Sequence, residues 1–194
     1  MNIIPSVIGL GYVGLPIFLK LQQKFRTIGY DNDKSRIYNL NKKIDTNKEF
    51  TQKKLYLTNG SYFTSKLDKL KKSNFYIVAV PTPVNKNNVP DLDNLKDSCI
   101  LISKVLKKND IVFFESTVYP GVTENFCARL LEKKSKLKSN KDFFIGYSPE
   151  RINPGDKNHS IDKIYKIVST KKPFAMSIAK RVYKKITKKL VTTR

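Results

Sequence analysis

The stretch VIGLGYVG, residues 7–14, contains glycines in the spacing G-x-G-x-x-G, at Gly9, Gly11 and Gly14. A short apolar run leads into them, and apolar residues recur at helical spacing over residues 13–25. Between a strand and a helix, the first glycine permits a tight turn, the second lets the backbone approach a pyrophosphate, and the third lets the helix pack on the strand. The stretch therefore predicts a dinucleotide-binding unit. A glycine turn that serves packing alone is the alternative.

An acidic residue stands where this kind of unit needs one. Asp31 follows the next apolar run, FRTIGY, at about the twenty-residue distance at which a carboxylate accepts a hydrogen bond from a ribose hydroxyl. A carboxylate there repels the 2′-phosphate of NADP, so Asp31 favours NAD as the cofactor. Arg36, a few residues further on, makes this preference less sharp.

Strand and helix patterns alternate along most of the chain. Apolar runs predict strands at residues 2–10, 25–31, 75–80, 111–116, 142–147 and 166–170. Helical patterns cover residues 13–25, 34–40, 91–106 and 121–131. Residues 43–74 are polar and cannot be assigned, and Asp33 is the expected cap of the second helix. This alternation predicts an α/β protein with a Rossmann-like, doubly wound parallel sheet.

Two further junctions, VAVPTP and ESTVYPG, lie where predicted strands end. Ligands of open α/β sheets bind beyond the carboxyl ends of the strands, so Thr82 and Thr117 are expected near the cofactor. Taken singly, each threonine is more often a helix cap or a turn residue than a ligand.

The charge of the chain is unusual. Its 194 residues include 38 Lys and Arg against 16 Asp and Glu, a formal net charge of +22. The excess is nearly all lysine, spread through every segment, which favours a solvated lysine coat over a specific nucleic-acid surface. The alternative is a Rossmann-fold binding protein whose basic surface engages polyanions.

The sequence gives little indication of a membrane segment, a metal site or disulfides. No apolar run has the length of a membrane span, and the N-terminus lacks the features of a signal peptide, so we expect a cytoplasmic protein without membrane contacts. Cys99 and Cys127 have no partner at metal-ligand spacing and fall in predicted helices. We expect two buried or semi-buried structural thiols and no metal.

Five motifs together resemble a known family. In chain order they are GLGYVGLP, YDNDKSRI, VAVPTP, ESTVYPGVTE and YSPERINPGDKNH. They resemble the N-terminal half of the UDP-glucose/GDP-mannose dehydrogenases, and the last is most similar to the branch that oxidises UDP-N-acetylhexosamines to uronic acids for capsule or O-antigen polysaccharide. The resemblance implies that residues 1–194 are the NAD-binding domain of a nucleotide-sugar dehydrogenase. Such enzymes use two NAD to take a sugar C6 alcohol to a carboxylate through a cysteine-bound intermediate.

The resemblance also implies roles for individual residues. NAD contacts are expected from Gly9, Gly11, Tyr12, Val13, Gly14, Asp31, Arg36, Thr82 and Thr117. Glu150 and Thr117 are the expected catalytic residues: Glu150 matches a carboxylate that assists water or proton transfer in the hydrolytic step, and the two position water and cofactor. Arg151 and Ile152 match positions that line the UDP-sugar site. Alternatively, Glu150 and Arg151 pair with other charges on a solvated loop. Pro154 stands where the glucose-oxidising branch has a second Glu, which speaks against UDP-glucose.

The family's later segments do not appear in this sequence. The resemblance places a catalytic Lys and Asn on a helix after the NAD domain, and then a nucleophilic Cys in a glycine-rich loop. Neither Cys99 nor Cys127 matches that loop. We therefore expect a chain truncated after the first domain, without the central dimerisation helix or the C-terminal substrate domain and inactive alone. A separately encoded C-terminal half is a candidate partner.

Overall fold

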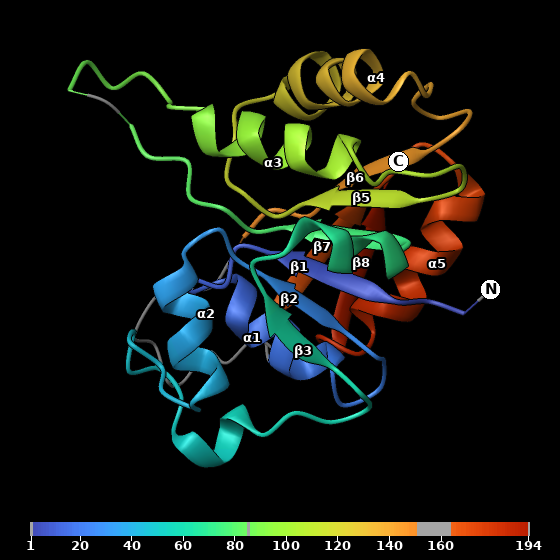
Figure 1. The fold of residues 1–194 in the computed structure, drawn as a ribbon. Helices are drawn as coiled ribbons and strands as arrows, with labels where there is room; N and C mark the ends of the chain where they lie inside the picture. Colours follow the sequence, from blue (N-terminus) through green and yellow to red (C-terminus); the bar gives the residue numbers. More distant parts are fainter. Residues whose placement is uncertain (1, 85, 151–163, 194) are drawn as a thin grey trace.

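A central sheet organises the protein, as the computed structural model in Figure 1 shows for residues 2–84, 86–150 and 164–193, which are the residues that the structure describes. Within these residues the sheet has eight strands in the order β3-β2-β1-β4-β5-β6-β7-β8. The strands are β1 (Pro5–Ile8), β2 (Ile28–Tyr30), β3 (Tyr62–Thr64), β4 (Phe75–Val78), β5 (Ile111–Phe114), β6 (Phe144–Tyr147), β7 (Tyr165–Ser169) and β8 (Lys189–Thr193). The chain winds outward from β1 in both directions, which confirms the predicted doubly wound sheet.

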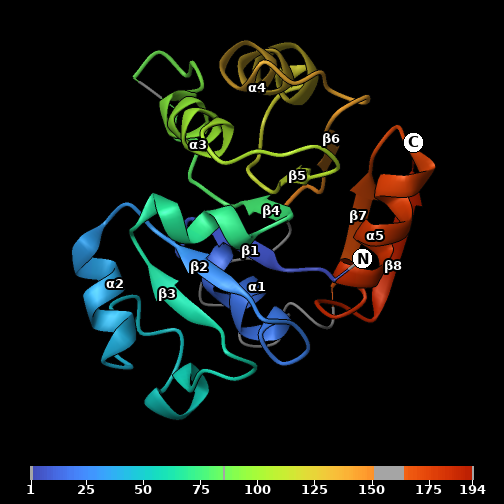
Figure 2. The same cartoon turned by 45° about the vertical axis from the view of Figure 1, so that its right-hand side comes forward.

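Strand direction departs from the prediction at one place. From β3 to β6 every neighbouring pair is parallel, whereas β7 runs antiparallel to β6, with Tyr147 opposite Ser169. β8 is parallel to β7, and the helix between them makes the crossover that parallel neighbours need. Figure 2 shows this helix, α5, lying against β7 and β8. The sheet is therefore mixed, with its last two strands reversed.

Helices cover both faces of the sheet. The α-helices are α1 (Gly14–Leu21), α2 (Lys34–Asn41), α3 (Asp93–Ser103), α4 (Arg129–Ser135) and α5 (Pro173–Tyr183). Two 3-10 helices, η1 (Gln52–Leu55) and η2 (Leu67–Lys72), and a π-helix, η3 (Val122–Ala128), complete the described set. Val7 on β1 faces a buried cluster with α1, α2 and α5, and its neighbour Ile8 faces a second cluster with α3, η3 and α4. Figure 1 shows α3 and α4 together on one side of the sheet and α1 on the other.

The helices bear out most sequence expectations. The Asp33 side chain caps α2 by accepting from the Ser35 N–H at 2.8 Å. Cys99 on α3 and Cys127 on η3 are buried and free, as expected for structural thiols. The unassigned residues 43–74 contain η1, β3 and η2, and α5 and β8 were not predicted from the sequence.

Two kinds of feature are absent from the described part of the chain. No helix there has the length and apolarity to cross a membrane. No group of three or more His, Cys, Asp or Glu side chains there is placed to hold a metal ion.

Candidate functional site

The glycine-rich loop joins the end of β1 to the start of α1. Gly9 has φ +88°, a conformation that side chains rarely adopt, and its N–H donates to Tyr30 O at 2.9 Å. At Gly14 a Cβ would lie 1.8 Å from the carbonyl oxygen of Gly9. At Gly11, by contrast, a Cβ would meet no atom within 4 Å. The loop is thus closed by contact at Gly9 and Gly14 and open over Gly11, where a ligand has space.

Asp31 lies at the carboxyl end of β2, beside this loop. Its Oδ2 accepts from the Leu10 N–H at 2.8 Å, and its Oδ1 accepts from the Asp33 N–H at 3.0 Å. The half-buried carboxylate is thereby fixed in place and lines a cavity of about 360 Å³. Other residues around this cavity include Gly9, Gly11, Tyr30, Pro81, Asn94 and Ser98. Each carboxylate oxygen has a further lone pair, so Asp31 retains capacity for a ribose hydroxyl.

A second cavity, of about 330 Å³, adjoins the first at Gly11. Both are lined by Gly11, Ala79, Val80 and Pro81. The second cavity gathers five further candidates, namely Tyr12, Val13, Thr82, Thr117 and Glu150, whereas Gly14 and Arg36 line neither cavity. A larger cavity of about 510 Å³ lies at α5 and β8, and none of the site residues predicted from the sequence lines it. Eight of the predicted site residues therefore line the two adjoining cavities at the carboxyl edge of the sheet.

Hydrogen bonds tie the loops after β4 and β5 together. The Thr82 hydroxyl donates to the carbonyl oxygen of Thr117 at 2.6 Å, and the Ser116 hydroxyl donates to the carbonyl oxygen of Val80 at 2.6 Å. The Thr82 hydroxyl thus has a structural partner, while both threonines still line the second cavity. The two loops form one wall.

A buried cluster of charges lies behind this wall. Glu115 follows β5, and its Oε2 pairs with the ammonium group of Lys166 on β7. Both side chains are 0% exposed. The buried hydroxyl of Tyr183 on α5 donates to Glu115 Oε1 at 2.6 Å. Burial raises the pKa of Glu115, helped by the nearby charge of Glu150 and opposed by Lys166 and Tyr183.

Glu150 connects this cluster to the second cavity. Its Oε2 lies 3.6 Å from Lys166 Nζ, and its side chain is 10% exposed. One ammonium group therefore faces two carboxylates, Glu115 and Glu150. The Lys166 ammonium also donates to the carbonyl oxygen of Pro149 at 3.3 Å, which holds the backbone beside Glu150. The other two candidates of this segment, Arg151 and Ile152, lie outside the described residues.

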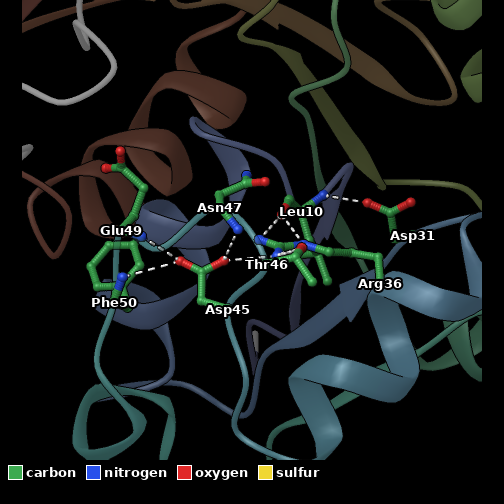
Figure 3. Close-up of polar contacts among 8 residues, drawn as sticks. All are labelled: Leu10, Asp31, Arg36, Asp45, Thr46, Asn47, Glu49 and Phe50. Atoms are coloured by element: carbon green, nitrogen blue, oxygen red, sulfur yellow. Dashed lines mark hydrogen bonds and ion pairs between the residues drawn. The ribbon is translucent and has the colours of Figure 1, made fainter.

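The side chain of Arg36 on α2 points toward Leu10 and Asp45, as Figure 3 shows. Its Nε and Nη2 donate to the carbonyl oxygen of Leu10 at 3.0 and 2.8 Å. Its Nη1 donates to Asp45 Oδ1 at 2.7 Å and to Thr46 Oγ1 at 2.8 Å. The ribose contact expected of Arg36 stays a prediction. In this structure its bonds go to the glycine-rich loop and to the segment after α2.

Four residues of the buried charge clusters were not predicted from the sequence, namely Glu115, Lys166, Tyr183 and Asp45. A glutamate directly after an apolar strand, as in FFES, is a signal that could have identified Glu115, because such strand ends face the ligand edge. Lys166 stands in an alternating strand, where a lysine is normally exposed, so the sequence carries no signal that it is buried. Asp45 lies within residues 43–74, which show no clear strand or helix periodicity.

Known proteins resemble this chain over nearly its whole length. Residues 1–187 match the NAD binding domain of the UDP-glucose/GDP-mannose dehydrogenase family. Protein CapL of Staphylococcus aureus is 47% identical over 186 residues, which cover 96% of this chain and 44% of that protein. UDP-N-acetyl-D-glucosamine 6-dehydrogenase of Pseudomonas aeruginosa is 45% identical over 181 residues, covering 93% of this chain and 43% of that enzyme.

A solved structure agrees as well. The UDP-D-ManNAc dehydrogenase of Pyrococcus horikoshii superposes with a TM-score of 0.87 at 28% identity, covering 99% of this chain and 47% of that one. The chain thus spans less than half the length of the relatives that it matches. The family match over nearly the whole chain shows that this protein belongs to the UDP-glucose/GDP-mannose dehydrogenase family, with residues 1–187 as its NAD-binding domain.

Proposed function

We propose that this chain is the NAD-binding part of an enzyme that oxidises the C6 alcohol of a UDP-N-acetylhexosamine to a carboxylate. The observation that carries the proposal is the pair of adjoining cavities at Gly11, one lined by Asp31 and the other by Thr117 and Glu150. A dinucleotide has two ends joined by a pyrophosphate, and this arrangement offers a place for each part on either side of the glycine-rich loop.

The residues fit NAD. Open space over Gly11 admits the pyrophosphate, and Asp31 accepts from the adenosine ribose in the first cavity. Val13, Thr82 and Thr117 line the second cavity, which takes the nicotinamide end. Bound there, NAD supplies the acceptor for the hydride that leaves the sugar carbon in each oxidation.

We assign the chemistry at the nicotinamide end to Glu150 and Thr117. The Glu150 carboxylate assists water or proton transfer in the hydrolytic step, because a base beside the acyl carbon is what this step requires. Its position depends on Lys166, whose ammonium lies 3.6 Å from Glu150 Oε2. Thr117, which lines the same cavity, helps to position the water. We also propose that Arg151 and Ile152 line the sugar-nucleotide site, since they follow Glu150 directly.

The substrate class and a partner follow from the relatives. Two of them bear names that specify UDP-N-acetyl-D-glucosamine and UDP-N-acetyl-D-mannosamine as substrates. They are more than twice as long as the matched segment, so we propose that turnover requires a C-terminal half, as a continuation or as a separate chain. Neither thiol of the described residues serves as the nucleophile, because Cys99 and Cys127 are buried inside helices.

Mixing this chain with a C-terminal half tests the proposal. NADH absorbance is measured with saturating NAD and UDP-N-acetyl-D-glucosamine or UDP-N-acetyl-D-galactosamine, for this chain alone and with the C-terminal half of the Pseudomonas aeruginosa enzyme. NADH is expected only on mixing, because the thiolate that traps the aldehyde is then supplied. Glu150→Gln in the mixture should slow hydrolysis of the acyl intermediate without changing NAD affinity. Steady turnover by this chain alone would contradict the proposal.

Cofactor selectivity provides a second test. The chain is expected to bind NAD more tightly than NADP, because the Asp31 carboxylate repels a 2′-phosphate and accepts from a free hydroxyl. Asp31→Ala should weaken NAD binding by about 1–3 kcal/mol through loss of that hydrogen bond. Calorimetry with both cofactors measures this, and Asp33→Ala, which removes a neighbouring carboxylate outside both cavities, is the control. Equal affinities of the wild type for NAD and NADP would remove the ribose role of Asp31.

A further inference from the structure

Asp31 and Arg36 hold opposite sides of one residue of the glycine-rich loop. Asp31 accepts from the Leu10 N–H, and Arg36 donates twice to the Leu10 carbonyl oxygen. The guanidinium therefore lies next to the candidate ribose site. A nearby arginine is what lets this type of fold accept the 2′-phosphate of NADP, since a guanidinium binds phosphate with two parallel hydrogen bonds. Whether Arg36 is free to do so determines the selectivity of the site.

Four of the five N–H groups of the guanidinium are already used. Two donate to the Leu10 carbonyl, one to Asp45 and one to Thr46. The Arg36 side chain is only 8% exposed, and that of Asp45 is 0% exposed. The pair is therefore a buried one, unlike the exposed pairs that contribute little. Figure 3 shows Arg36 reaching from the Leu10 side of the network to Asp45.

Asp45 is itself fixed by the backbone. Its Oδ1 accepts from the Asn47 N–H at 3.2 Å, and its Oδ2 accepts from the N–H groups of Glu49 and Phe50 at 2.9 and 3.0 Å. The carboxylate cannot follow Arg36 outward without breaking these bonds. If Arg36 turned alone toward a phosphate, it would leave Asp45 buried and charged without its cation, which is strongly unfavourable.

We propose that Asp45 determines cofactor selectivity by withholding Arg36 from the 2′-phosphate position. The inference rests on the proposed binding of NAD at the adjoining cavities. Selection against NADP then has two components: the Asp31 carboxylate repels the 2′-phosphate, and the Asp45 carboxylate keeps the adjacent guanidinium bound to the Leu10 carbonyl. Removing Asp31 alone is therefore insufficient to create an NADP site.

The experiment compares wild type, Asp31→Ser, Asp45→Asn and the double variant by calorimetry, using the ratio of Kd for NADP to Kd for NAD. Asparagine suits position 45 because its carbonyl oxygen can replace Oδ2 toward Glu49 and Phe50, while its amide then presents a donor to Arg36. Asp31→Ser should lower the ratio modestly. The double variant should lower it further by about ten- to a hundredfold, as expected for a charge-assisted hydrogen bond to phosphate.

Thr46→Val in the Asp31→Ser background is the matched control. It removes one hydrogen bond to Arg36 but leaves the Asp45 pair, so the ratio should equal that of Asp31→Ser alone. A double variant with the same ratio as Asp31→Ser overturns the inference, as does a full shift to NADP in Asp31→Ser alone. A wild type that binds NAD while the double variant fails to shift rejects only this inference. A wild type that binds neither cofactor rejects the proposed function as well.

A second comparison serves if Asp45→Asn does not fold, which circular dichroism would reveal. In the Asp31→Ser background, Arg36→Met should change the affinities for NAD and NADP by the same factor. A guanidinium that stays bound to Asp45 and to the Leu10 carbonyl affects both cofactors only through its hydrogen bonds to the glycine-rich loop. A larger loss for NADP would mean that Arg36 already reaches the 2′-phosphate, and the inference would be wrong.

Discussion

Gly14→Ala is expected to destabilise the protein by about 3 kcal/mol or more, at or above the upper end for overpacked sites. The added Cβ would lie 1.8 Å from the carbonyl oxygen of Gly9 and 3.2 Å from Cγ1 of Val7. The nearest atom belongs to the backbone, so no side-chain rotation relieves the clash. The gain from replacing a helical glycine by alanine, about 1 kcal/mol, is smaller than this cost. Denaturant unfolding measures the change as a shift in the midpoint.

Gly11→Ala is the matched control from the same loop. A Cβ at Gly11 meets nothing within 4 Å, so the free energy of unfolding should stay within about 0.5 kcal/mol of the wild type. The new methyl group projects into the space that we assign to the pyrophosphate, so NAD affinity should fall while stability does not. Equal stability losses in both variants would show that the close contact at Gly14 does not limit the fold.

Much of this geometry could be predicted because its signals are local. The spacing of Gly9, Gly11 and Gly14 reflects contacts within one turn, and Asp31 lies at the end of the adjacent strand. The strands from β1 to β6, apart from the three-residue β3, are apolar enough to be recognised individually. The reversed direction of β7 could not be read from its sequence, since parallel and antiparallel strands share the same side-chain alternation.

The buried charges could not be predicted, because their partners are distant along the chain. Glu115 is 51 residues from Lys166 and 68 residues from Tyr183. The place of Glu115 after an apolar strand indicates the ligand edge, but nothing within these three segments indicates that their side chains meet. Arg36 and Asp45 are only 9 residues apart, but Asp45 lies in a segment without periodicity, so nothing indicated that it would turn inward. Only the folded chain reveals which charges are buried together.

Lys166→Met is expected to destabilise the protein by about 3–5 kcal/mol at neutral pH, the usual cost of removing one partner of a buried ion pair. Methionine nearly matches the length of lysine, so the main loss is the charge. Among the described residues, Glu115 would be left fully buried with only the Tyr183 hydroxyl as a side-chain partner, and Glu150 would lose the ammonium group that lies 3.6 Å away. Denaturant unfolding of both proteins gives the difference. Lys171→Met, at an exposed lysine just after β7, should change it by less than about 0.5 kcal/mol.

The pH dependence separates lost charge from lost packing. Burial raises the folded-state pKa of Glu115 above its ordinary value of 4.5, whereas Lys166 lowers it. A raised folded pKa means that the folded protein binds more protons than the unfolded chain between the two values, so this contribution to stability falls as pH rises through that window. Lys166→Met raises the folded pKa further and widens the window toward higher pH. The stability difference between the wild type and Lys166→Met should therefore be smaller at acidic pH, and should grow as pH rises from the folded-state pKa of Glu115 in the wild type toward its higher pKa in the variant.

Removing the carboxylate along with the cation should restore much of the stability. In Glu115→Gln/Lys166→Met no charge of the pair remains, and the glutamine still accepts from the Tyr183 hydroxyl. The titratable groups that face the pair, Glu150, Tyr147 and Tyr183, stay in place, so the remaining pH dependence reports on them. We expect the double variant to be more stable than Lys166→Met at neutral pH and to lose most of the added slope. A double variant as unstable as Lys166→Met at every pH would mean that the lysine contributes packing rather than charge, because an uncompensated Glu115 would then not be the cause.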